Sequence, residues 1–124
     1  MLLKEVVELL NCKIYTPENY NENYELNFAF GSDLMSDALM LLRTAPENFF
    51  EEGMLLTGLV TNQSIRTAEM LDFQVVMLVR DKKPNQNVID SAMESGIALL
   101  STPFSMFSAA GKLWEKGVRG VSEA

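Results

Sequence analysis

The chain has 124 residues, a mass of 13.9 kDa and a formal net charge of -7, and 48% of its residues are apolar. This length leaves room for one hydrophobic core, so we expect a single domain over residues 1–124, and the composition excludes a disordered or collagen-like chain. The negative charge would repel a phosphate backbone and no basic stripe is present, so we expect no nucleic-acid partner.

The segment 3–25 predicts a helix, a short strand and a loop. Apolar side chains recur with helical spacing over 3–10, with charged residues on the opposite side. Residues 12–16 alternate as in a strand, which Pro17 ends. The polar, asparagine-rich segment 18–25 has no helical stripe, so we expect an exposed, mobile loop there.

Residues 26–30 predict a strand, followed by a tight turn and by a helix over 33–43 that Ser32 or Asp33 would cap. This helix carries apolar residues around nearly its whole circumference, which indicates burial on more than one side. It lies either between sheet and loop within one chain or in a subunit interface, and the pattern fits both. A homodimer is the default oligomer, and we expect one.

Alternation of strand and helix continues after a loop at 48–53. The apolar runs 54–60 and 74–79 predict strands covered on both faces, and Thr61 or Asn62 would cap the helix between them.

The last third of the chain repeats this alternation. A helix over 88–96 ends at a glycine, and 97–100 is the last strand. Thr102 and the proline after it predict the start of a final helix, whose Phe104, Phe107 and Trp114 stripe we assign to the core. The tail 118–124 is expected to fray.

Continuous apolar strands separated by crossover helices predict the α/β class, with a mainly parallel sheet flanked by helices. Ligands bind such sheets beyond the carboxyl ends of the strands, where helices present free backbone amides. Each turn at this edge is also explained by helix capping alone. The candidate ligand-binding residues are Gly31, Ser32, Asp33, Thr57, Gly58, Thr61, Asn62, Arg66, Ser101 and Thr102. The turn Arg80-Asp81-Lys82 belongs to the same edge, and Arg66 and Lys82 are the candidate contacts to an anion.

No catalytic signature is recognisable in the sequence. The chain lacks a P-loop, a nucleophile elbow and any histidine, and it has one cysteine, Cys12, which we expect to be a buried, unreactive side chain. We therefore expect no enzyme, no metal site and no cofactor. An acid-base pair of Asp33 and Asp37 on one helix face is the enzymatic alternative, but the helix dipole explains these carboxylates equally well.

The acidic excess is concentrated in residues 1–62, which carry three basic residues and ten acidic ones, whereas residues 63–124 carry seven of each. This indicates either a solvated acidic face or a docking surface for a basic partner. No apolar run is long enough for a signal peptide or a membrane span, so we expect a cytoplasmic protein without a membrane partner.

The order of several short segments resembles the DRTGG domain family over nearly the whole chain. These segments are 31–37 (Gly-Ser-Asp-Leu-Met-Ser-Asp), 55–58 (Leu-Leu-Thr-Gly), 65–68 (Ile-Arg-Thr-Ala) and, near the end, Gly96-Ile97 with Leu100-Ser101-Thr102. The run Asp-Arg-Thr-Gly-Gly itself is absent. DRTGG domains occur alone or joined to CBS modules and phosphotransacetylase-like enzymes, and they are similar in fold to the amino-terminal domain of HPr kinase/phosphorylase.

The resemblance implies a regulatory role and supplies no catalytic residues. We therefore expect a non-enzymatic, homodimeric regulatory or protein-interaction module. The alternative is a small-molecule sensor that binds a nucleotide or phosphometabolite at the carboxyl edge of the sheet.

Overall fold

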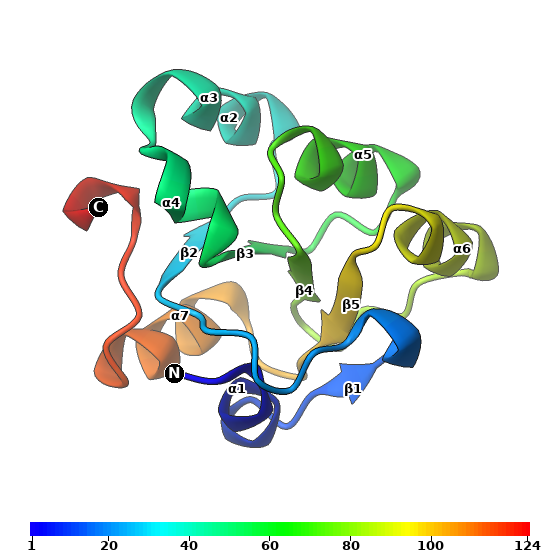
Figure 1. Ribbon diagram of the computed structural model, residues 1–124. Coiled ribbons are helices and arrows are strands. Elements are labelled where there is room, and N and C mark those ends of the chain that lie inside the picture. The colour runs from blue at the N-terminus through cyan, green and yellow to red at the C-terminus, as the bar shows by residue number, and fades with distance from the viewer.

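One five-stranded sheet forms the centre of the computed structural model, which describes residues 1–124 (Figure 1). Its strands are β1 (Lys13–Ile14), β2 (Phe28–Gly31), β3 (Gly53–Thr57), β4 (Val75–Leu78) and β5 (Ala98–Ser101). They lie in the order β1-β5-β4-β3-β2, with β2 to β5 parallel and β1 antiparallel to β5 at one edge. The predicted α/β class with a mainly parallel sheet is confirmed.

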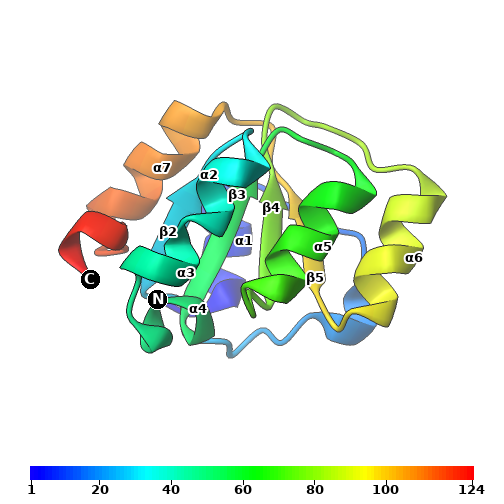
Figure 2. The same ribbon diagram turned by 90° about the horizontal axis from the view of Figure 1, so that it is seen from above.

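Helices cover both faces of the sheet (Figures 1 and 2). They are α1 (Leu3–Leu9), α2 (Met35–Leu39), α3 (Leu41–Thr44), α4 (Glu47–Glu51), α5 (Asn62–Met70), α6 (Gln86–Glu94) and α7 (Met106–Glu115), with 3-10 turns η1 (Pro17–Asn19) and η2 (Val121–Glu123). One face carries α2 to α6, and the other carries α1 and α7. No helix combines the length and apolar character that a membrane crossing needs.

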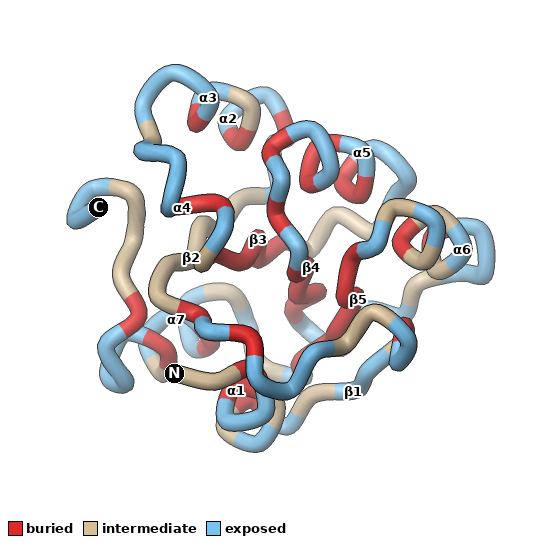
Figure 3. The backbone as a smooth tube through the Cα atoms, viewed as in Figure 1, coloured by how far each residue is buried: buried red, intermediate tan, exposed pale blue.

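The buried residues form two cores, one on each face of the sheet (Figure 3). Strand β3 contributes side chains to both cores, because successive side chains of a strand point to opposite faces of the sheet. Leu55 packs among the residues of α2 to α6, whereas Met54 and Leu56 pack with α1 and α7. This two-sided burial explains why β3, β4 and β5 read as continuous apolar runs.

The segment 48–53, predicted as a loop, is largely helical. Helix α4 buries Phe49 and Phe50, which stack edge-on with each other at a centroid distance of 5.7 Å and both contact Phe73. Burial of these two adjacent aromatic rings stabilises helix α4, which local sequence alone does not predict.

The predicted helix 33–43 is divided into α2 and α3 at Met40. It buries Met35, Ala38 and Leu41 and half-buries Leu39, while three other large apolar side chains of the segment are exposed. The exposed ones are Leu34, Met40 and Leu42. Within one chain the segment is therefore buried along one stripe only.

Helix α7 begins later than predicted and presents a different face to the core. Ser105 caps it, accepting a hydrogen bond from the N–H of Ser108, so Thr102 is not the cap. Ala109 and Leu113 point inward, while Phe107 is 89% exposed and Trp114 is 49% exposed. The prediction that the aromatic stripe lies in the core is wrong for these two residues.

Two segments expected to be exposed or frayed are tied to the sheet. In the 18–25 segment Tyr24 is buried, and its hydroxyl donates to the carbonyl oxygen of Gly53 at 2.8 Å. In the tail Val118 is buried, and Arg119 pairs with the outer edge of β2. The tail therefore covers part of the open sheet edge.

Candidate functional site

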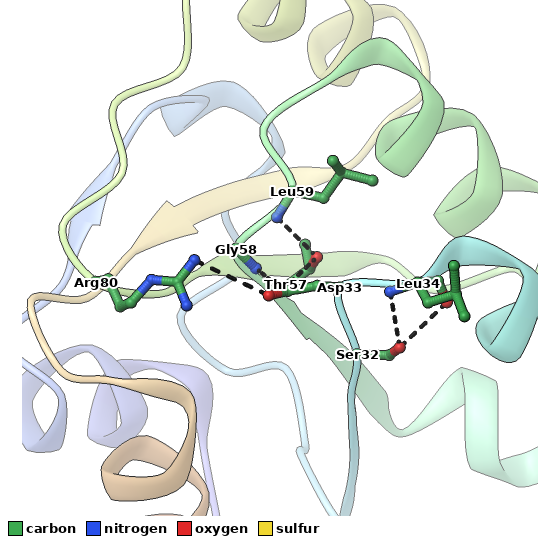
Figure 4. Close-up of polar contacts among 7 residues, drawn as sticks. All are labelled: Ser32, Asp33, Leu34, Thr57, Gly58, Leu59 and Arg80. Atoms are coloured by element: carbon green, nitrogen blue, oxygen red, sulfur yellow. Dashed lines mark hydrogen bonds and ion pairs between the residues drawn. The ribbon is translucent and has the colours of Figure 1, made fainter.

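The carboxyl ends of β2, β3 and β4 meet at one edge of the sheet, and we call the residues there, 31–33, 57–58 and 80–82, the rim. The three strands run parallel and are neighbours, so their final turns lie side by side (Figures 2 and 4). This is the edge at which α/β sheets bind ligands.

Asp33 joins the three turns of the rim. Its Oδ1 accepts a hydrogen bond from the backbone N–H of Gly58 at 2.5 Å and a longer one from the hydroxyl of Thr57 at 3.5 Å (Figure 4). Its Oδ2 lies 3.9 Å from Nη2 of Arg80, and the two charged side chains are 51% and 50% exposed. The carboxylate thus lies between a backbone amide and a guanidinium group, two kinds of donor that bind anions in proteins.

Gly58 allows this approach because it has no side chain. A Cβ at this position would lie 2.5 Å from Nη2 of Arg80 and 3.1 Å from Oδ1 of Asp33. The buried hydroxyl of Thr57 accepts a hydrogen bond from the N–H of Leu59 at 3.0 Å, so the chain turns directly after β3. The backbone N–H of Gly58 therefore points toward Asp33.

The turn after β4 has an uncommon backbone. Arg80 and Asp81 have φ angles of 61° and 56°, in the left-handed region that non-glycine residues rarely adopt. The N–H of Arg80 donates to the carbonyl of Phe104, and that of Asp81 to the carbonyl of Thr102, both at 2.8 Å. These bonds fix the turn against the segment that follows β5 and leave the Arg80 side chain directed across the rim (Figure 4).

The sequence indicates the turn 80–82 and favours Lys82 and Arg66 as the cationic contacts, whereas in the structure Arg80 of this turn lies beside Asp33. Arg66 is exposed on α5 and takes part in neither of the two ion pairs of the molecule. The signal for Arg80 is its place as the first charged residue after the apolar run that ends at Val79.

Ser32 and Asp33 do not cap α2. The hydroxyl of Ser32 accepts from the N–H of Leu34 at 3.0 Å and donates to the carbonyl of the same residue at 3.1 Å. Leu34 occupies the N-cap position without a side-chain bond. Asp33 faces Gly58 and lies outside the helix, so it does not share a helix face with Asp37.

Thr61 and Asn62 belong to the start of α5. The hydroxyl of Thr61 caps the helix by accepting from the N–H of Ser64 at 3.4 Å, as one of the two predicted caps, and Asn62 is its exposed first residue. Neither residue is bonded to Asp33 or to its partners Thr57, Gly58 and Arg80.

Ser101 and Thr102 are buried, at 1% and 0% exposure, and neither side chain is bonded to Asp33. The hydroxyl of Thr102 donates to the carbonyl of Leu10 at 2.6 Å and accepts from the N–H of Phe104 at 3.3 Å. Thr102 therefore ties the end of α1 to the end of β5. Of the ten candidates, the structure brings together Gly31, Ser32, Asp33, Thr57 and Gly58 at the rim.

Gly31 also lines a pocket of about 140 Å³ between β2, α7 and the tail. Its lining is mainly apolar, and the guanidinium of Arg119 covers the Trp114 ring at 4.0 Å from the ring centroid. The same guanidinium donates to the carbonyl oxygens of Trp114 and Val118, at 3.0 and 3.1 Å. We call this space, lined by Ala29, Gly31, Leu56, Ala110, Leu113, Trp114, Val118, Arg119 and Gly120, the α7 pocket.

Cys12 is not bonded to Asp33, and its sulfur lies 3.6 Å from that of Met77. Burial raises the pKa of its thiol from 9.0 to about 12, so the group is protonated at neutral pH. No group of three or more cysteine or carboxylate side chains is arranged to hold a metal ion.

No protein-family model matches the sequence, and no curated protein matches it either. Among solved structures, the chain is similar to the CBS and DRTGG domains of the regulatory region of a Clostridium perfringens pyrophosphatase, determined in complex with the activator diadenosine tetraphosphate. The TM-score is 0.69 and the sequence identity 13%, over 90% of this chain and 45% of the other. The chain thus shares its fold with part of that structure and spans about half of its length.

Proposed function

We propose that the chain is a regulatory or protein-interaction module of DRTGG type that works as a homodimer in the cytoplasm. The shared fold with a pyrophosphatase regulatory region, over 90% of this chain, carries the proposal. The order of the short segments that resembles the DRTGG family adds to it. A module of this kind acts by binding the surface of another protein.

Exposed apolar side chains support the homodimer. Leu34, Met40 and Leu42 project from the α2–α3 segment, and Phe107 and Trp114 project from α7. Large apolar side chains gathered at a surface mark sites of association. Light scattering at tens of micromolar tests this: a mass near twice 13.9 kDa is expected, and a mass of 13.9 kDa would exclude the dimer.

A second candidate function is an effector sensor at the rim. The N–H of Gly58 and the guanidinium of Arg80 hold the Asp33 carboxylate, and a phosphate group has the charge and oxygen acceptors to replace it. An effector that displaced Asp33 would also release the turn that leads into α2.

Thermal unfolding with a panel of anions tests the sensor. We would use inorganic phosphate, AMP, ATP and diadenosine tetraphosphate, the activator bound to the similar regulatory region. A ligand at 100 times its dissociation constant stabilises the folded chain by about 2.7 kcal/mol.

Two matched variants locate the binding site of any probe that stabilises the chain. Arg80→Gln should abolish the stabilisation by that probe, whereas Arg66→Gln should leave it unchanged. The reverse result would move the site to α5, and no stabilisation by any probe would exclude the sensor while leaving the interaction module in place.

A further inference from the structure

We infer that a second copy of this chain packs on α7, through an antiparallel pairing of the two α7 helices about a twofold axis. The inference rests on the proposed homodimer and assigns its interface. Two surfaces compete for this role, the α2–α3 segment and α7, and the structure distinguishes them by shape.

One face of α7 projects away from the core. Phe107, Ala110 and Trp114 follow one another at intervals of three and four residues, so they form a continuous stripe along the helix. Phe107 is 89% exposed, the most exposed of the large apolar side chains, and the inward face of the helix is formed by Ala109 and Leu113. The stripe is therefore a free apolar ridge with an aromatic ring at each end.

The α7 pocket adjoins this stripe, since Ala110 and Trp114 line it. Its volume of about 140 Å³ is suited to one phenyl ring, because an apolar protein cavity of about 150 Å³ can bind benzene. The same short stretch of helix thus carries a protruding phenyl ring and an apolar hollow of matching size. A surface with both features can pair with a copy of itself.

The spacing along α7 fits a twofold pairing. Phe107 and Trp114 lie equally far from the midpoint between Ala110 and Gly111, about 5 Å along the axis on either side. In an antiparallel pair centred there, Phe107 of one copy faces Trp114 of the partner subunit, and the contact occurs twice. Ala110 and Gly111 are small and exposed, and a Cβ added at Gly111 would meet no atom within 4 Å, so the helices can approach closely.

The charged residues of α7 also leave the stripe free. Lys112, Glu115 and Lys116 lie about 80–180° around the helix axis from Phe107, so a partner seated on the stripe meets none of them directly. In addition, none of the pockets is lined by Leu34, Met40 or Leu42.

Cysteine cross-linking tests the pairing in the full chain with Cys12→Ala as background. Ala110→Cys lies next to the proposed twofold axis, so mild oxidation should convert most of the protein to a covalent dimer. Ser108→Cys is the matched control, because Ser108 is exposed on nearly the opposite side of the same helix. Equal cross-linking of both variants, or none at Ala110→Cys, would overturn the assignment.

A series of substitutions tests separately whether the chain dimerises and whether α7 forms the interface. Phe107→Ser should raise the dimer dissociation constant at least about tenfold, as expected for an aromatic anchor, while Leu42→Ser should leave it unchanged. Circular dichroism checks that both variants fold. A chain that is monomeric without substitution refutes the homodimer itself, whereas a dimer that survives Phe107→Ser and dissociates with Leu42→Ser refutes only the α7 interface.

Discussion

The carboxylate of Asp33 accepts a hydrogen bond from the backbone N–H of Gly58, which ties the ends of β2 and β3 together across 25 residues of sequence. The same carboxylate faces the guanidinium of Arg80 at the end of β4. One side chain therefore links the last turns of three parallel strands. Replacing it by different residues measures the contributions of the hydrogen bond and of the ion pair to stability separately.

Replacing Asp33 should reveal the hydrogen bond as the stronger of the two contacts. Asp33→Ala removes the acceptor for the Gly58 amide and should lower the free energy of unfolding by about 1 kcal/mol. Asp33→Asn keeps an acceptor oxygen and loses only the half-exposed ion pair, so a smaller loss, below about 1 kcal/mol, is expected. Urea denaturation measures both, with Asp37→Ala as an exposed control; equal losses for Asp33→Asn and Asp33→Ala would contradict this order.

Thr102 should prove structural and unrelated to any ligand. Thr102→Val keeps the shape of the side chain and leaves the carbonyl of Leu10 without its donor, which should cost about 1–3 kcal/mol of stability. The same change at the exposed Thr44 should have little effect. A stable Thr102→Val variant that has lost binding of a rim ligand would show that the hydroxyl serves the site after all.

Two glycines should respond to alanine in opposite directions. A Cβ at Gly53 would overlap the backbone carbonyl oxygen of Phe49 and press on the Phe73 ring, so Gly53→Ala should cost about 1–3 kcal/mol or more. Gly111 lies within α7 with open space around it, so Gly111→Ala should raise helix stability by about 0.5–1 kcal/mol. Thermal unfolding at high dilution compares them, and a neutral Gly53→Ala would contradict the packing of α4 on β3.

Alkaline pH should destabilise the fold. Burial raises the pKa of Cys12 to about 12 and that of Tyr24 to about 12, so the folded chain keeps both protons where the unfolded chain loses them. The unfolded chain then binds fewer protons, and the free energy of unfolding falls as the pH rises from about 9 toward 12.

Urea titrations at several pH values measure this slope. Cys12→Ala should flatten it, because Cys12 contributes from its unfolded pKa of 9.0 upward. Unchanged slopes in Cys12→Ala would contradict the buried, protonated thiol.

Local periodicity was sufficient for the regular elements of the second half of the chain. The apolar run 74–79 and the stripe through Val88 and Ala92 correspond to β4 and α6, because each element buries a complete face of its own. Periodicity also shows which residues share a side of a helix, but it does not show which side is inward. For this reason the pattern predicts a buried aromatic stripe on α7, whereas Ala109 and Leu113 occupy the inward side.

The candidate site was predicted in part, for a related reason. The edge of the sheet and the turn at Asp33 follow from strand order and local composition. The roles of Thr102 and Arg80 depend on partners far away in sequence, since Thr102 bonds to Leu10 across 92 residues and Arg80 meets Asp33. Such pairings arise only when the sheet is assembled, and no local pattern contains them.

The mass of the unmodified chain across a dilution series tests the proposed module most directly. Sedimentation equilibrium should give a species of about 28 kDa, twice the chain mass, at tens of micromolar, with reversible dissociation to 13.9 kDa on dilution. A constant mass of 13.9 kDa at every concentration would contradict the homodimer and the pairing of α7.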